Sequence, residues 1–232
     1  KAGAVVIDNS SAFRMDPEVP LVVPEVNPQA ILKHKGIIAN PNCSTIIMVM
    51  ALKPIYDLAK IKRVIVSTYQ AVSGAGKEGI DELDAQVRDH SEGREMTANI
   101  LPSASAEKHY PIAFNLIPQI DVFCDNLYTK EEMKMVNETK KIMEDYEMRI
   151  TATTIRVPVY RSHSESVNIE LEKEVDLGAM REALAKFPGV TVQDDPSKQE
   201  YPMPLYTSEK DDVYVGRLRR DESCEKSYNC LL

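Results

Sequence analysis

The sequence predicts an α/β protein with a mixed sheet, and three observations support that class. Short β-branched strands alternate with amphipathic helical segments, as at 64–69 and 77–90. A glycine turn at 74–76 joins that strand to that helix. The 232 residues are 43% hydrophobic, which is enough to bury one large domain or two small ones. Strand, glycine turn and helix in this order are typical of α/β proteins.

The first forty residues predict two short strands joined by an irregular connection. Residues 3–8 have the apolar, β-branched sequence of a buried strand. Four prolines between 16 and 28 exclude a helix there and predict extended or turning backbone. A second apolar strand is expected at 36–39. Since the first strand has nothing before it to pair with, we expect further residues upstream of Lys1.

A buried helix is expected at 43–52, where apolar residues occupy nearly every face. Asn40, Pro41 and Asn42 lead into it, so Cys43 lies in its first turn. Aligned peptide dipoles and unpaired N–H groups at a helix start favour a thiolate, which predicts a lowered pKa for this thiol. Most free cysteines are packing residues, however, so the position of Cys43 does not by itself make it catalytic.

The second half of the chain predicts more helices and strands after a polar, proline-containing stretch at 91–112. The clearest helix begins after Thr129, because Glu131 and Glu132 fall in its first turn and two lysines follow later. The chain stops at apolar residues without a polar tail, so we expect residues beyond Leu232 as well. The expected elements are helices at 130–146 and 176–187, and strands at 150–157, 165–172 and 212–218.

Charge and cysteine content exclude several classes of protein. A formal net charge of −8 and a pI near 5.2 argue against a general nucleic-acid or anionic-membrane surface, since both ligands favour a basic face. No stretch reaches the roughly 20 apolar residues of a membrane span. Four cysteines without CxxC pairs indicate reduced thiols, no metal site and a cytoplasmic location. An anionic substrate would then need a local group of basic residues.

Two further residues have the chemistry of a functional site. His163 lies in a polar run at 160–166, where an imidazole can act as a general acid or base, although a lone histidine is usually structural. Arg156 interrupts an apolar stretch, where a guanidinium is costly unless a carboxylate or phosphate pairs with it. Its partner is either an internal carboxylate, in a salt bridge, or the carboxylate of a substrate.

A cysteine with a histidine fits two classes of enzyme: thiol hydrolases, and oxidoreductases that form an acyl thioester. The sequence around Cys43 lacks the C-G-S-C-W neighbourhood of papain-like proteases. Residues 68–76 instead supply a strand-end amide, from Gln70, and a glycine turn that can approach a cofactor or an oxyanion closely. The oxidoreductase class is therefore favoured.

Four short motifs occur in order: P-N-C-S-T at 41–45, T-Y-Q-A-V-S-G-A-G at 68–76, R-V-P-V at 156–159 and H-S-E-S-V at 163–167. With 22–27 and 109–115 they extend over nearly the whole chain, and in this combination the sequence resembles bacterial aspartate-semialdehyde dehydrogenase. The resemblance implies NADPH-dependent reductive dephosphorylation of L-aspartyl 4-phosphate to L-aspartate 4-semialdehyde through a cysteine thioester. It also implies a homodimer and a place in lysine, threonine, methionine and diaminopimelate biosynthesis.

The resemblance assigns roles to individual residues. Cys43 would be the nucleophile, His163 the general acid/base, and Gln70 would orient the acyl intermediate. Arg156 would bind the substrate α-carboxylate, and Glu131 would bind the α-amino group. The phosphoryl group would be bound by Arg14 and Lys134, with Asn42 assisting. Ser73 and Gly74 would lie against the nicotinamide or the cofactor phosphates. From the sequence itself, Glu131 and Lys134 share a helix face, which a solvated ion pair would also explain. Arg14 could equally be an exposed loop residue.

The family opens with a glycine-rich turn that binds the dinucleotide phosphates, and no such turn occurs before residue 36. By resemblance, residues 1–41 are the C-terminal remnant of a Rossmann-like NADP-binding domain, and 42–232 are an α+β catalytic and dimerisation domain. The main phosphate-binding loop for NADP(H) would be missing from this chain. Two alternatives stay open: a related acyl-phosphate reductase, of the N-acetyl-glutamyl-phosphate or glyceraldehyde-phosphate type, and an inactive dimerisation module.

Overall fold

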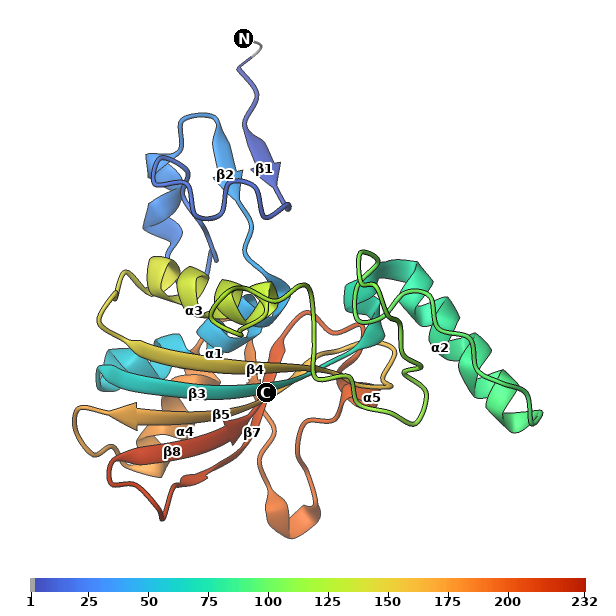
Figure 1. Ribbon diagram of the computed structural model, residues 1–232. Helices are drawn as coiled ribbons and strands as arrows, with labels where there is room; N and C mark the ends of the chain where they lie inside the picture. The colour runs from blue at the N-terminus through green and yellow to red at the C-terminus, as the bar shows by residue number, and fades with distance from the viewer. Residues whose placement is uncertain (1–2) are drawn as a thin grey trace.

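The computed structural model describes residues 3–232, which contain two sheets of different size (Figure 1). The small sheet pairs two parallel strands, β1 (Val6–Asp8) and β2 (Ile37–Ala39). The connection between them, residues 9–36, has the 3₁₀ helix η1 (Pro28–Lys33) as its one helical segment. The prolines thus exclude an α-helix here, as predicted, and both strands are shorter than the sequence indicated. The prediction of a buried first strand was wrong, because Val6 and Ile7 of β1 are exposed.

The large sheet has six strands in the order β4-β3-β5-β8-β7-β6. It is mixed, as predicted, because β4 and β6 run parallel to their neighbours while the other pairs are antiparallel. The last residues of β3 and β4 are paired with each other, and the first residue of β5 is paired with Tyr69, next to them. These three strand ends therefore lie next to one another, on the side of the sheet where β3 and β4 end and β5 begins. The strands are β3 (Ile61–Gln70), β4 (Arg149–Arg156), β5 (Ser164–Leu171), β6 (Val190–Val192), β7 (Val213–Arg220) and β8 (Ser227–Leu231).

Three helices contribute to the main hydrophobic core with the large sheet: α1 (Cys43–Leu58), α3 (Lys130–Met143) and α4 (Leu177–Lys186). The apolar sequence of α1 follows from its position, since it contacts α3, α4 and the sheet. α3 lies between the two sheets, whereas α2 (Gly76–Ser91) projects away from them (Figure 1). The short helices are η2 (Val72–Ala75), η3 (Pro196–Lys198) and α5 (Pro204–Thr207). Within residues 3–232, none of the helices has the length and apolar composition of a membrane span.

The main difference from the sequence prediction lies near the end of the chain. Residues 227–231 form β8, which pairs with β5 on one side and β7 on the other. The apolar residues there belong to an interior strand, in which Tyr228 and Cys230 are buried. The short strand β6 was also not predicted from the sequence. Finally, α1 continues to Leu58, while α3 stops at Met143 because Glu144 is left-handed, with φ 52°.

Candidate active site

Strand ends at one edge of the large sheet bring together three residues predicted from the sequence. Gln70 and Arg156 are partners in the register of β3 and β4, and His163 immediately precedes β5. Arg156 is close enough to His163 to lower the pKa of the imidazole. Glu131 and Cys43 are in turn close enough to Arg156 to favour its charged form and raise its pKa, against the larger effect of burial. Side chains from four segments of the chain are therefore neighbours.

Asn42 sets the position of Cys43 by capping α1. Its Oδ1 accepts the N–H groups of Ser44 and Thr45 at 3.0 and 3.2 Å. Its Nδ2 donates to Oε1 of Glu131 at 2.9 Å. Asn42 is buried, and both ends of its amide are hydrogen-bonded, so it connects the start of α1 to α3. Cys43 is the first residue of the helix, as predicted.

The pKa of the Cys43 thiol is raised, which is opposite to the direction predicted from the sequence. The residue is exposed, but protein atoms around the thiol desolvate it, and the Glu131 carboxylate disfavours the thiolate further. Hydrogen bonding by Ser44 acts the other way without compensating. The prediction was wrong because the burial of the thiol, and then the Glu131 carboxylate, come from parts of the chain distant in sequence, which the residues near Cys43 do not reveal.

His163 is held in one tautomer. Its Nδ1 accepts the backbone N–H of Ala71 at 2.9 Å, so the neutral ring carries its proton on Nε2. Burial and then the Arg156 charge lower the pKa of His163 to about 4. At neutral pH the ring is therefore uncharged and presents an Nε2–H donor.

Arg156 is a buried guanidinium without a carboxylate partner in the described part of the chain. It is 3% exposed, its Nη1 donates to the carbonyl of Ala71 at 2.7 Å, and its Nε has no partner. The internal salt bridge that the sequence left open is therefore absent from residues 3–232. Gly74 packs directly against it: a Cβ at this position would lie 2.7 Å from Nη1 and 3.3 Å from Cε1 of His163.

Glu131 connects several parts of the site. Its Oε1 accepts from Asn42 and from Nε2 of Gln70, the latter at 3.1 Å, while its Oε2 pairs with Lys134 at 3.2 Å. Lys134 also pairs with Asp121 at 3.0 Å. The predicted shared face of Glu131 and Lys134 is confirmed. Because Glu131 is buried, this is not the solvated ion pair that spacing alone would suggest.

Arg14 is buried against α3 and is not an exposed loop residue. Its Nε donates to the carbonyl of Asn40 at 2.8 Å and its Nη2 to that of Asn9 at 3.1 Å. Its Nη1 pairs with Glu138 at 3.2 Å. Arg14 and Lys134 share a cavity of about 180 Å³, so two of the predicted phosphoryl ligands are brought together. Its other lining residues are Ser11, Met15, Lys130, Met133, Asn137 and Glu138.

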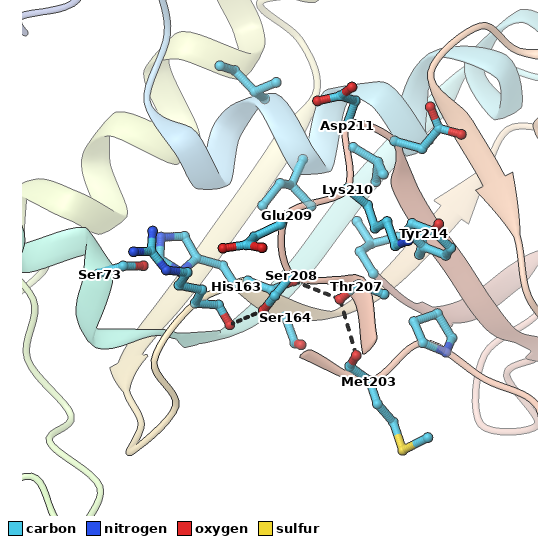
Figure 2. A pocket seen from close by; sticks show the side chains of 18 residues that line it. Ser73, His163, Ser164, Met203, Thr207, Ser208, Glu209, Lys210, Asp211 and Tyr214 are labelled. Atoms are coloured by element: carbon cyan, nitrogen blue, oxygen red, sulfur yellow. Dashed lines mark hydrogen bonds between the residues drawn. The ribbon is translucent and has the colours of Figure 1, made fainter. Parts of the chain in front are cut away.

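Ser73 lies on the other side of His163, beside a larger cavity. The cavity has a volume of about 430 Å³, and Ser73 and His163 line it together with residues 202–203 and 207–214. Figure 2 shows these side chains. Cys43, Arg156 and Glu131 do not line it. Of the two predicted cofactor residues, Ser73 lines this cavity, whereas Gly74 packs against Arg156 and His163.

Glu138 and Lys141 were not predicted from the sequence as site residues. Both contact the segment that carries Arg14, and both lie on the face of α3 that holds Glu131. Their spacing from Glu131, seven and ten residues, is the signal that could have identified them.

A thiol, an imidazole and an unpaired guanidinium gathered at a sheet edge form the arrangement of a cysteine-dependent catalytic centre. Comparison with known proteins narrows this class. Residues 52–231 match the family model "Semialdehyde dehydrogenase, dimerisation domain", and residues 1–34 match "Semialdehyde dehydrogenase, NAD binding domain". The chain therefore belongs to the semialdehyde dehydrogenase family.

The chain is similar to several aspartate-semialdehyde dehydrogenases. The one from Aquifex aeolicus is 57% identical over 97% of this chain, and the one from Bacillus subtilis is 55% identical over 95%. A crystal structure of aspartate semialdehyde dehydrogenase II from Vibrio cholerae is 46% identical, with a TM-score of 0.92 over 99% of the chain. The chain spans 65% of the length of the Aquifex protein and 66% of the Vibrio structure.

Proposed function

We propose that this chain carries the catalytic centre of an aspartate-semialdehyde dehydrogenase. The protein would convert L-aspartyl 4-phosphate and NADPH to L-aspartate 4-semialdehyde, phosphate and NADP⁺. Relatives at 57% and 55% identity bear that name, and one of the solved structures is a complex with ASA. The observation that carries the proposal is the buried, carboxylate-free guanidinium of Arg156 beside Cys43, which fits a substrate with a carboxylate near its acyl group.

The first chemical steps follow from the positions of Cys43 and the basic cavity. The sulfur of Cys43 attacks the acyl carbon, the bond from that carbon to the phosphate oxygen breaks, and an acyl thioester forms. Arg14 and Lys134 receive the departing phosphate. NADPH, when bound, supplies the hydride that reduces the thioester carbon. Breakage of the C–S bond then releases the aldehyde and returns the thiol.

His163 and Gln70 act on the oxygen of the reacting carbonyl. His163 presents Nε2–H, which can hydrogen-bond the oxyanion of each tetrahedral intermediate. To act as a general base, its Nδ1 must first release the Ala71 N–H. Gln70 is oriented by the Thr68 hydroxyl on its Oε1 and by Glu131 on its Nε2, which leaves its second Nε2–H for the acyl oxygen.

Arg156 and Glu131 bind the amino-acid end of the substrate in this proposal. Arg156 has free donors on Nε and Nη2 for a bidentate bond to the α-carboxylate. Glu131 already accepts three hydrogen bonds, and a carboxylate has about four acceptor positions, so one remains for the α-amino group. Asn42 positions Cys43 by capping α1 with its Oδ1, and it positions Glu131 by a hydrogen bond from its Nδ2.

The chain's residues fit only the reactive end of NADP(H). Cys43 is exposed and Ser73 lines a cavity together with His163, so the nicotinamide would lie near these residues, while Gly74 packs against Arg156 and His163. The two short strands of residues 1–41 would end an NADP-binding domain, and 42–232 would be the catalytic and dimerisation domain. The two family matches, 1–34 and 52–231, lie on either side of that boundary.

We further propose that the protein works as a homodimer in the cytoplasm. The name of the matched dimerisation domain supports self-association. The four cysteines are unpaired, as expected for a reducing compartment.

The function can be tested in the reverse direction on the full-length protein. Aspartate semialdehyde, phosphate and NADP⁺ should yield NADPH, and Cys43→Ser should abolish the reaction while leaving the fold intact by circular dichroism. Mass spectrometry should detect an acyl adduct on Cys43. Preference for N-acetylglutamate semialdehyde or glyceraldehyde 3-phosphate would overturn the substrate assignment. Full activity of Cys43→Ser would overturn the mechanism.

A further inference from the structure

One face of α3 carries four charged residues that each contact a different part of the site. Glu131, Lys134, Glu138 and Lys141 are spaced by three, four and three residues, which places them along one side of a helix. The first two belong to the proposed substrate site. The function proposed above does not use Glu138 and Lys141.

Glu138 bonds both the nucleophile's helix and the phosphate-site arginine. Its Oε2 accepts the backbone N–H of Asn42 at 2.7 Å, and its Oε1 pairs with Nη1 of Arg14 at 3.2 Å. The residue is 1% exposed. Asn42 is the cap of α1 and precedes Cys43, so one carboxylate joins Arg14 to the residue beside the thiol.

Lys141 holds the backbone of the same segment. Its Nζ donates to the carbonyls of Arg14, Asp16 and Val19 at 2.8, 2.7 and 2.9 Å. The main chain of Arg14 is thus bound by Lys141 and its guanidinium by Glu138, one helical turn apart on α3. The segment containing Arg14 comes from the region before α1, and α3 sets its position relative to Cys43.

We propose that Glu138 is a positioning residue that holds the Arg14 guanidinium at a fixed separation from the Cys43 thiol, so that phosphate and acyl carbon are bound together. This inference rests on the proposed function. Without the charge on Glu138, Arg14 keeps its two carbonyl partners but loses the bond that aims Nη1. Binding of phosphate then weakens, while the aldehyde site, built on Arg156 and Glu131, is unaffected.

Glu132 offers a matched control on the same helix. It is also buried, but its carboxylate accepts only backbone N–H groups, from Thr129 at 2.7 Å and Thr154 at 3.0 Å. It contacts neither Arg14 nor Asn42. Removing the charge of Glu132 therefore measures how much KM for phosphate and the melting temperature change when a buried carboxylate with a structural role alone is lost.

The test compares Glu138→Gln with Glu132→Gln in the full-length protein, assayed with aspartate semialdehyde, phosphate and NADP⁺. In Glu138→Gln the amide oxygen still accepts the Asn42 N–H. We expect its KM for phosphate to rise about tenfold, the size of one lost charge-assisted bond, with KM for the aldehyde within about twofold. Glu132→Gln should lower the melting temperature and leave KM for phosphate unchanged.

A double-mutant cycle with Arg14→Gln separates coupling from general damage. If Glu138 acts through Arg14, then Glu138→Gln should add no further rise in KM for phosphate in the Arg14→Gln background. Equal rises in both KM values, or additive effects in the cycle, would overturn the positioning role. Stabilisation by inorganic phosphate in thermal unfolding gives a readout without turnover, and it should be lost in Glu138→Gln. If the wild-type protein shows this stabilisation but no activity, the proposed function fails and the positioning role stands.

Discussion

Replacing Glu165 by glutamine should change how stability depends on pH. Glu165 lies in β5, has no solvent exposure, and has no hydrogen-bond partner on either carboxyl oxygen. Burial, followed by the Glu131 charge, raises its pKa well above the ordinary value of 4.5. The native protein therefore keeps the proton on Glu165 to a higher pH than the unfolded chain does.

The sign and the size follow from proton linkage. A carboxyl with a raised native pKa releases its proton on unfolding, so its contribution to stability is complete below about pH 4.5 and is lost as pH rises. While the native group stays protonated, the loss is about 1.4 kcal/mol per pH unit. Glu165→Gln cannot ionise and removes that slope.

Urea unfolding of this chain, followed by far-UV circular dichroism because it contains no Trp, measures the effect. The free energy of unfolding of Glu165→Gln minus that of the wild type should increase with pH from 5 to 8. Glu222→Gln, at an exposed position, controls for loss of a surface charge. A difference that stays flat or decreases with pH would show that native Glu165 is already ionised.

The remaining predictions concern the candidate active site and the segment that carries Arg14, which Lys141 binds. Arg156→Lys should raise KM for aspartate semialdehyde by about tenfold or more, by loss of the bidentate bond, with KM for phosphate little changed in steady-state kinetics. Gly74→Ala should place a methyl group 2.7 Å from the Arg156 guanidinium and lower kcat/KM by at least about tenfold, while the melting temperature stays near wild type. Lys141→Met should cost about 3 kcal/mol in urea unfolding, since three backbone carbonyls lose their donor. Iodoacetamide labelling of Cys43 without substrate should be slow at pH 7 and accelerate only above the ordinary thiol range; fast labelling at pH 6 would contradict the raised pKa.

The elements that the sequence predicted well have local causes. The start of α3 follows from Thr129 and Glu132, which bond each other's backbone within four residues. The position of Cys43 follows from the Asn42 cap. β8 could not be identified this way, because its apolar residues are explained by two neighbouring strands that pair with it.

The sequence by itself determined which chemical groups are available. They are a thiol at a helix start, an imidazole just before a strand and an arginine in an apolar strand. The tertiary structure decided their partners and their charge. It desolvated the Cys43 thiol and placed Glu131 beside it, and both raise the pKa of that thiol. It also buried His163 and placed Arg156 beside it, and both lower the pKa of the imidazole. It also joined Arg14 to Glu138 across 124 positions of chain. Capping and periodicity act within a few residues, whereas desolvation and Coulomb interactions depend on distances in space, which only the folded chain defines.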